Sequence, residues 1–191
     1  FEHLILATGS TPAMPTVFDL GSDRIMDSTG ALRLQDVPKR LLVIGGGYIG
    51  LEMGTVYAHL GSQVSVVELT SGLLPGADRD LVRPLHKRLN ELFGDRIYLD
   101  TKVGSLGLQG DQVEVAFEGP AKYGVERYDR VLVSVGRRPN SRGIGLENTQ
   151  VQVNERGFVV CARTQRTADP HILAIGDGAG EPRLAHKAST E

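Results

Sequence analysis

Short apolar runs alternate with amphipathic stretches through the middle of the chain. The run Leu41–Ile44 is continuously apolar and ends in glycines, which is typical of a strand buried on both faces. Another strand is expected over Gln63–Glu68. Between them, apolar residues recur at helical spacing at Ile49, Met53, Val56 and Leu60. This order predicts an α/β fold, with a Rossmann-like parallel sheet built from βαβ units.

A second helix is predicted after this strand. It runs from about Asp78 to a stop at Gly94. Pro84 lies inside the pattern, so we expect the helix to begin later or to kink there. Its apolar face is expected to consist of Leu81, Leu85, Leu89 and Leu92.

The pattern becomes strand-like after residue 99. Residues 102–108 and 112–117 are separated by Gly110-Asp111, which is a hairpin signal. A further buried strand is expected over Tyr128–Val135. We therefore expect an antiparallel β-meander added to the parallel sheet, within a central domain of residues 36–140.

Residues 1–35 and 141–191 flank this domain without a complete βαβ unit. The chain opens without Met and directly in a strand-like run, so we expect it to be a piece of a longer protein. Within these flanks, residues 1–20 and 150–191 should then pair with each other beside the core, associate between chains, or be partly disordered. Three apolar strands end in glycine, at Leu4–Gly9, Val131–Gly136 and Ile172–Gly176. Glycine at such a position allows close approach by a ligand or another backbone.

Composition and charge exclude several classes of protein. The chain has 21 basic and 23 acidic side chains and a net charge of −2, which argues against a nucleic-acid or membrane surface. No apolar run approaches the length of about 18 residues that a membrane span needs, and no signal peptide opens the chain. A cytoplasmic protein is expected. The single cysteine excludes an internal disulfide and a CxxC metal cluster, and no metal site is expected.

The chemistry of the chain is concentrated in one glycine motif. The sequence from Gly45 to Gly50 matches G-x-G-x-x-G, directly after a predicted strand and at the start of a predicted helix. In such a motif Gly45 permits the tight turn, Gly47 lets a pyrophosphate approach the backbone, and Gly50 lets the helix pack on the strand. The phosphates then face the positive end of the helix.

An acidic residue follows the motif at the expected distance. Glu68 lies 18 residues after Gly50, at the end of the second strand. A carboxylate there accepts hydrogen bonds from the adenosine ribose and repels a 2′-phosphate. The residues 69–71 include no arginine that could bind this phosphate, so NAD is favoured over NADP. For Glu52, two alternatives stay open: a cofactor contact, or simple complementation of the helix dipole.

Four segments in order resemble the flavoprotein disulfide reductase family. Val43–Glu52 is similar to its NAD(P) fingerprint, and Ala7–Ser10 resembles the first crossing into the nucleotide domain. Ser134–Asn140 resembles the return crossing, and Ala174–Asp177 with the following Leu184–Ala188 resembles the second FAD motif. The resemblance implies that 1–35 and 141–191 are partial FAD-domain segments around an NAD-binding domain at 36–140.

The resemblance also implies roles for individual residues. Glu52 would lie near the nicotinamide, Val103 would line the adenine pocket, and Gly136 would contact the cofactor through its backbone. Asp177 would bind the FAD ribityl chain. The NAD pyrophosphate would be wrapped by Gly45, Gly46, Gly47, Tyr48, Ile49, Gly50, Leu51 and Glu52. Along the flavin would lie Thr8, Gly9, Ser10, Arg183, Leu184, Ala185 and His186.

Within the family, Glu68 and the string Leu184–Ala188 look most like the branch that oxidises dihydrolipoamide. That branch uses a redox disulfide and FAD to reduce NAD+, as a homodimer that serves the lipoyl-bearing components of 2-oxo acid dehydrogenase complexes. The chain lacks the first FAD fingerprint, the redox cysteine pair and the catalytic His-Glu pair. No residue here is therefore expected to be catalytic, and the segment alone should be inactive.

Other interpretations of the same residues stay open. The parent could be another NADH-linked flavoprotein, such as an NADH oxidase or a mercuric reductase. A non-catalytic NAD-binding module would leave Asp177 unexplained, and a structural scaffold would leave the spacing from Gly45 to Glu68 to chance. Cys161 lies in a strand-like run and is interpreted as a small buried residue rather than a nucleophile.

Overall fold

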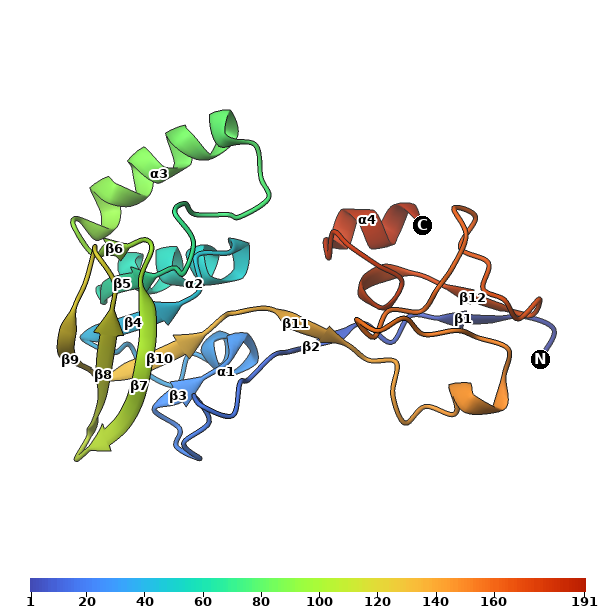
Figure 1. Cartoon of the computed structure of the whole chain (residues 1–191), viewed down its shortest axis with the longest axis horizontal. Helices are drawn as coiled ribbons and strands as arrows, with labels where there is room; N and C mark the ends of the chain where they lie inside the picture. Colours follow the sequence, from blue (N-terminus) through green and yellow to red (C-terminus); the bar gives the residue numbers. More distant parts are fainter. The chain divides into compact units, whose positions relative to one another are not determined.

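A five-stranded parallel sheet lies at the centre of residues 12–136, one of the two compact units of the chain (Figure 1). The computed structural model describes all 191 residues. The strand order is β3–β10–β4–β5–β6, and all four pairings are parallel. The bounds are β3 (Ile25–Met26), β4 (Arg40–Ile44), β5 (Gln63–Val67), β6 (Ile97–Tyr98) and β10 (Arg130–Val133). The predicted parallel sheet is confirmed.

Helices and antiparallel strands pack against opposite faces of this sheet. Leu41 and Val43 of β4 belong to the core that contains helix residues, whereas Leu42 and Ile44 belong to the core shared with the meander. This alternation follows from the period of two along a strand. The helices are α1 (Ser28–Leu32), α2 (Tyr48–His59) and α3 (Arg79–Phe93), and the meander strands are β7 (Lys102–Gln109), β8 (Gln112–Glu118) and β9 (Gly124–Tyr128).

The meander contains one strand more than the sequence pattern predicted. The apolar run expected as a single strand over Tyr128–Val135 is divided, because Tyr128 ends β9 and β10 begins at Arg130. Asp129 forms the break: its carboxylate accepts the Arg40 amide at 2.8 Å, and its own amide donates to the Arg40 carbonyl at 3.0 Å. The chain therefore passes from the meander into the parallel sheet within one residue.

Helix α2 buries a face that only partly coincides with the predicted one, of which Met53 packs against the core. Its buried residues are Gly50, Leu51, Gly54 and Tyr57, while Val56 and Leu60 of the predicted face are 42% and 47% exposed. A Cβ atom on Gly54 would lie 3.4 Å from Phe93 and Val64 side-chain atoms. The prediction was wrong for Val56 and Leu60 because two of the four buried positions, Gly50 and Gly54, are glycine, which contributes nothing to a hydrophobic pattern.

Helix α3 begins directly after its N-cap Asp78 and ends at Gly94, which confirms the predicted start and end, and it does not begin later at Pro84. The Asp78 carboxylate accepts the Asp80 amide at 2.9 Å, and Pro84 lies within the helix. The buried residues are Val82, Leu89 and Phe93, whereas Leu81 is 75% exposed. Spacings of seven and four residues place these three on one stripe, Leu85 lies at its margin with 38% exposure, and Leu81 lies outside it.

Residues 1–11 and 137–191 form the second unit. Its strand β1 (Leu4–Leu6) pairs in parallel with β12 (Ile172–Ala174), and β2 (Ser10–Pro12) with β11 (Arg137–Pro139) makes another two-stranded sheet. Two 3₁₀ turns (Leu146–Asn148 and Gly176–Gly178) and α4 (Ala185–Thr190) complete it. The two flanks therefore pair with each other through β1 and β12, which confirms the first of the three expected arrangements. Residues 12–35 instead pack with the five-stranded sheet, because Ile25 pairs with Val131 and Ala31 is buried in its core.

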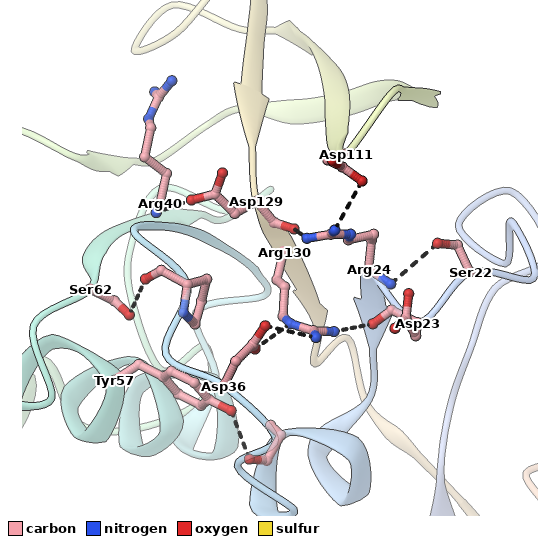
Figure 2. A network of polar contacts seen from close by, with 12 residues as sticks. Ser22, Asp23, Arg24, Asp36, Arg40, Tyr57, Ser62, Asp111, Asp129 and Arg130 are labelled. Atoms are coloured by element: carbon pink, nitrogen blue, oxygen red, sulfur yellow. Dashed lines mark hydrogen bonds and ion pairs between the residues drawn. The ribbon is translucent and has the colours of Figure 1, made fainter.

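A buried arginine ties the first residues of the sheet unit together (Figure 2). The Arg130 guanidinium donates to both carboxylate oxygens of Asp36, at 2.6 and 3.0 Å, and also to the Asp23 carbonyl. The hydrogen bonds that Arg130 donates to Asp36 raise the pKa of Arg130. On the same side, the Tyr57 hydroxyl donates to the Ala31 carbonyl at 2.8 Å, and burial raises the pKa of Tyr57. The loop before β4 is thereby held on β10, and α1 is held on α2.

The substitution Gly50→Ala should destabilise the sheet unit by about 1–3 kcal/mol, because a Cβ atom would lie 2.3 Å from the Gly45 carbonyl oxygen. Urea denaturation followed by circular dichroism measures this. Gly107→Ala is the matched control, since a Cβ there meets nothing within 4 Å. Equal stability of the two variants would contradict the close helix–strand contact.

The substitution Asp36→Asn should cost about 2 kcal/mol, because the Arg130 side chain is only 9% exposed and would lose its carboxylate partner. Asp111→Asn is the control: this carboxylate is 98% exposed and lies 3.4 Å from Arg24, so its loss should change stability by less than about 0.5 kcal/mol. The same denaturation measurement compares them. A smaller loss for Asp36→Asn than for Asp111→Asn would sink this account of the network.

Candidate functional site

The glycine motif forms the turn between β4 and α2. Gly45 has φ 107°, and a Cβ atom there would lie 2.5 Å from the Ser134 carbonyl oxygen of the neighbouring strand end. A Cβ atom on Gly50 would lie 2.3 Å from the Gly45 carbonyl oxygen. The Gly45 amide also donates a hydrogen bond to the Val67 carbonyl at 2.9 Å. Both glycines are therefore required by the chain's own packing.

Gly47 differs from them because nothing in the chain requires it to be glycine. Its φ of −77° suits any residue, and a Cβ atom there meets nothing within 4 Å. It is the N-cap of α2, with no side-chain capping bond and no acidic residue in the first turn. The amides of Gly47 and Ile49 donate to no group of the chain. An anion could therefore approach the helix end closely, which is how this terminus would hold a pyrophosphate.

The remaining motif residues have separate places on α2. Leu51 is buried in the core, Tyr48 is 40% exposed at the first turn, and Ile49 is half-buried. Glu52 is exposed on the second turn, beyond the first turn that a dipole-complementing acid would occupy. The position of Glu52 therefore does not suit complementation of the α2 dipole, and its contact with a cofactor stays a prediction.

Glu68 is buried at the end of β5, only 8% exposed, and its carboxylate already has three donors. The Gly46 amide donates to Oε2 at 2.7 Å, and the Thr70 amide and hydroxyl each lie 2.8 Å from Oε1. Because a carboxylate oxygen accepts about two hydrogen bonds, Oε2 retains room for a ligand hydroxyl. The side chain predicted to hold a ribose is thus fixed beside the glycine motif.

Gly46 links the motif to Glu68. A Cβ atom there would lie 2.8 Å from Leu73 and 3.2 Å from Glu68 side-chain atoms. The Gly46 carbonyl also accepts the Leu74 amide at 2.8 Å. Gly46 is predicted to bind the pyrophosphate, but its amide donates to Glu68. This contact between residues 22 positions apart has no local sequence signal.

The nearest arginine after Glu68 is occupied by the chain itself. Arg79 donates to the carbonyls of Leu73 at 2.9 Å, Leu74 at 2.6 Å and Ala77 at 2.9 Å. Its guanidinium therefore serves to fold the loop after β5. No other arginine lies between Glu68 and this residue, which agrees with the preference for a nucleotide without a 2′-phosphate.

Val103 and Gly136 lie elsewhere in the same unit. Val103 is 7% exposed in the core that joins the sheet to the meander. Gly136 has φ 135°, a backbone conformation that favours glycine, and its carbonyl accepts the Ala13 amide at 2.9 Å. Their assignments to an adenine pocket and to a backbone contact stay predictions.

In the second unit, Asp177 is held by residues from two distant segments. The Ser10 hydroxyl donates to Asp177 Oδ2 at 2.5 Å, and the Arg137 guanidinium donates to the hydroxyl oxygen and the carbonyl of Ser10, both at 2.6 Å. Arg137 Nε lies 3.7 Å from the same Oδ2. No donor of the chain reaches Asp177 Oδ1. That oxygen can accept from a ligand hydroxyl, as a ribityl chain would provide.

Other predicted flavin contacts fall into two groups. Thr8 and Gly9 adjoin Ser10, and their carbonyls accept from Asn140 at 2.9 and 3.0 Å. Arg183 packs over the Phe158 ring and lies 3.5 Å from Glu181. Leu184 is the N-cap of α4, where Ala185 and His186 are exposed. Arg137 and Asn140 also belong to this cluster and were not predicted as site residues, although both lie in the segment Ser134–Asn140.

The other candidate chemistry of the chain is sparse. Cys161 is half-buried, and burial raises the pKa of its thiol, which disfavours the reactive thiolate. No three His, Cys, Asp or Glu side chains gather as a metal site would need. A cavity of about 410 Å³ lies beside Asp36, Tyr57 and Arg130, and none of the predicted cofactor residues lines it. None of the helices combines the length and apolar character that crossing a membrane requires.

Comparison with known proteins matches the whole chain. The family model described as pyridine nucleotide-disulphide oxidoreductase matches residues 1–191. The dihydrolipoyl dehydrogenase of Haemophilus influenzae is 45% identical over all of this chain and 40% of its own length. The structure of the flavoprotein disulfide reductase RclA of Escherichia coli is 30% identical with a TM-score of 0.86, and it covers 98% of this chain and 42% of RclA. The structure of LpdA of Mycobacterium tuberculosis is 28% identical with a TM-score of 0.87, and it covers 98% of this chain and 40% of LpdA. The chain thus spans about 40% of the length of these proteins.

The substitution Gly47→Ala should leave the fold intact and weaken NADH binding at least about tenfold, because the added Cβ would occupy the space through which a pyrophosphate approaches. Calorimetric titration measures the affinity, and urea denaturation should show a stability change below about 1 kcal/mol. NADH binding that is as tight as in the unsubstituted chain would remove Gly47 from the site.

Proposed function

Because the chain belongs to the pyridine nucleotide-disulphide oxidoreductase family, we propose that it forms the NAD-binding domain and part of the FAD-binding region of a dihydrolipoyl dehydrogenase. The whole enzyme would oxidise dihydrolipoamide to lipoamide and reduce NAD+. Residues 12–136 would hold NAD, and the unit of residues 1–11 and 137–191 would belong to the FAD domain. In this proposal the FAD-domain segments are residues 1–11 and 137–191, instead of the expected 1–35 and 141–191.

The open helix terminus at Gly47, next to the fixed carboxylate of Glu68, is the observation that carries this proposal. Gly47 leaves room for a pyrophosphate at the positive end of α2. Glu68 offers Oε2 to a ribose hydroxyl from a buried position. Together the two groups match the phosphate and the ribose of one dinucleotide.

Asp177 supports the flavin part of the proposal in the same way. Ser10 and Arg137 fix its Oδ2, which leaves Oδ1 for a ribityl hydroxyl. When bound, the two cofactors supply the hydride and electron transfer, which no side chain of this chain provides. The residues of this chain bind and orient them. The proposed redox disulfide requires cysteines other than the single Cys161.

The identities favour the dihydrolipoamide branch over a flavoprotein disulfide reductase such as RclA. The chain is 45% identical to the dehydrogenase of Haemophilus influenzae and 30% identical to the reductase RclA. The lipoyl-bearing components of a 2-oxo acid dehydrogenase complex, a homodimeric parent and a cytoplasmic location belong to this proposal.

The chain should bind NADH at least about tenfold more tightly than NADPH, since a 2′-phosphate would meet the buried Glu68 carboxylate. Separate calorimetric titrations measure both affinities. Calorimetry suits this chain because it has no tryptophan to report binding. Glu68→Gln should weaken the binding of NADH and reduce the difference between the affinities for NADH and NADPH.

Glu91→Gln provides the control for a general change in charge. This side chain is 57% exposed on α3 and has no part in the proposed site, so NADH and NADPH affinities should stay as they are. Tighter binding of NADPH by the unsubstituted chain would overturn the role of Glu68. An absence of binding of either nucleotide would contradict the proposal that these residues hold NAD by themselves.

A further inference from the structure

Three groups that no motif connects meet at the Glu68 carboxylate. The Gly46 amide binds one oxygen, and the amide and hydroxyl of Thr70 bind the other. Since the side chain is 8% exposed, these donors replace most of the water that a carboxylate would otherwise bind. The orientation of the carboxylate is therefore decided by the chain before any nucleotide arrives.

The Thr70 hydroxyl has two possible acceptors and a single proton. Its oxygen lies 2.8 Å from Glu68 Oε1 and 3.0 Å from the Gly72 carbonyl oxygen. A hydrogen bond to an ionised acceptor is shorter and about twice as strong as one between neutral groups. The proton is therefore directed to Glu68, where it adds to the bond from the Thr70 amide.

The backbone around Thr70 is itself fixed. The Thr70 carbonyl accepts the Asp100 amide at 3.0 Å, and the Glu68 carbonyl accepts the Thr101 amide at 3.0 Å. The loop that follows is tied to Gly46 through the Leu74 amide and is folded around Arg79. A hydroxyl on this anchored segment can hold a neighbouring side chain in one rotamer.

Resting on the proposed function, we propose that Thr70 is a positioning residue that determines nucleotide specificity. It holds the Glu68 carboxylate on the Gly46 amide, so that Oε2 faces the ribose in one orientation. A nucleotide with a free 2′-hydroxyl meets an acceptor already in place, whereas a 2′-phosphate meets a charge that is unable to turn away. Thr70 acts through Glu68 and needs no contact with the nucleotide.

Thr70→Val tests this with little change in volume, because it removes the hydroxyl and keeps the amide donor. Thr70→Ser keeps both donors and should restore the behaviour of the unsubstituted chain. Thr70→Val should lower the ratio of NADH to NADPH affinity about fivefold in calorimetric titrations. In the Glu68→Gln background, the same substitution should leave the ratio unchanged, because the group that Thr70 positions has been altered.

Hydrogen exchange of the Gly46 amide gives a readout that needs no nucleotide. Thr70→Val should speed this exchange about fivefold, since the carboxylate that accepts the Gly46 amide is held less firmly. The Val66 amide, which donates to the Arg96 carbonyl at 2.8 Å, should exchange at an unchanged rate and so exclude general destabilisation. Both rates are measured by NMR on the full chain.

The outcomes separate this proposal from the proposed function. An unchanged rate of Gly46 exchange in Thr70→Val overturns the role of Thr70. An equal effect of Thr70→Val on the ratio of NADH to NADPH affinity in the unsubstituted and the Glu68→Gln backgrounds also overturns it. A chain that binds neither nucleotide contradicts the proposed function, while the Gly46 exchange rate still decides whether Thr70 holds Glu68.

Discussion

The close approach of α2 to the end of β4 is the constraint on which the rest of the sheet unit depends. It places Gly50 against the Gly45 carbonyl, so close that a single methyl group would not fit. The turn between them is bound on both sides, by Val67 of β5 and by the Ser134 amide, which donates to the Ile44 carbonyl at 2.8 Å. This packing fixes the amino end of α2 at the carboxyl edge of the parallel sheet, where open α/β sheets bind their ligands.

The same constraint explains how binding groups from separate elements act together. Once α2 is seated, Gly46 lies beside the end of β5, and its amide reaches the Glu68 carboxylate at 2.7 Å. The loop after Glu68 packs Leu73 onto Gly46 and returns its Leu74 amide to the same residue. One glycine therefore joins the helix terminus that would hold phosphates to the acid that would hold a ribose.

The second unit solves a similar problem with ionic groups instead of close backbone packing. Ser10, Arg137 and Asp177 come from three segments that are separated by more than a hundred residues at the widest. The Ser10 hydroxyl and the Arg137 guanidinium lie against Oδ2 of the Asp177 carboxylate and leave Oδ1 open. The parallel pairing of Leu4–Leu6 with Ile172–Ala174 brings these segments together, so that the flanks of the chain form a unit of their own.

The sequence by itself determined the parallel sheet, the hairpin after Lys102, and the glycine motif with Glu68 at the right spacing. These are local features, set by apolar runs, turn residues and the positions of glycines along one stretch of chain. Only the tertiary structure decided which face of α2 is buried, because Gly50 and Gly54 have no side chains to mark it. It alone also showed that Thr70 and Gly46 share the Glu68 carboxylate and that Arg137 reaches Asp177. Those contacts join elements that meet only when the sheet and the two flanks have formed, and no periodic pattern along the chain encodes such meetings.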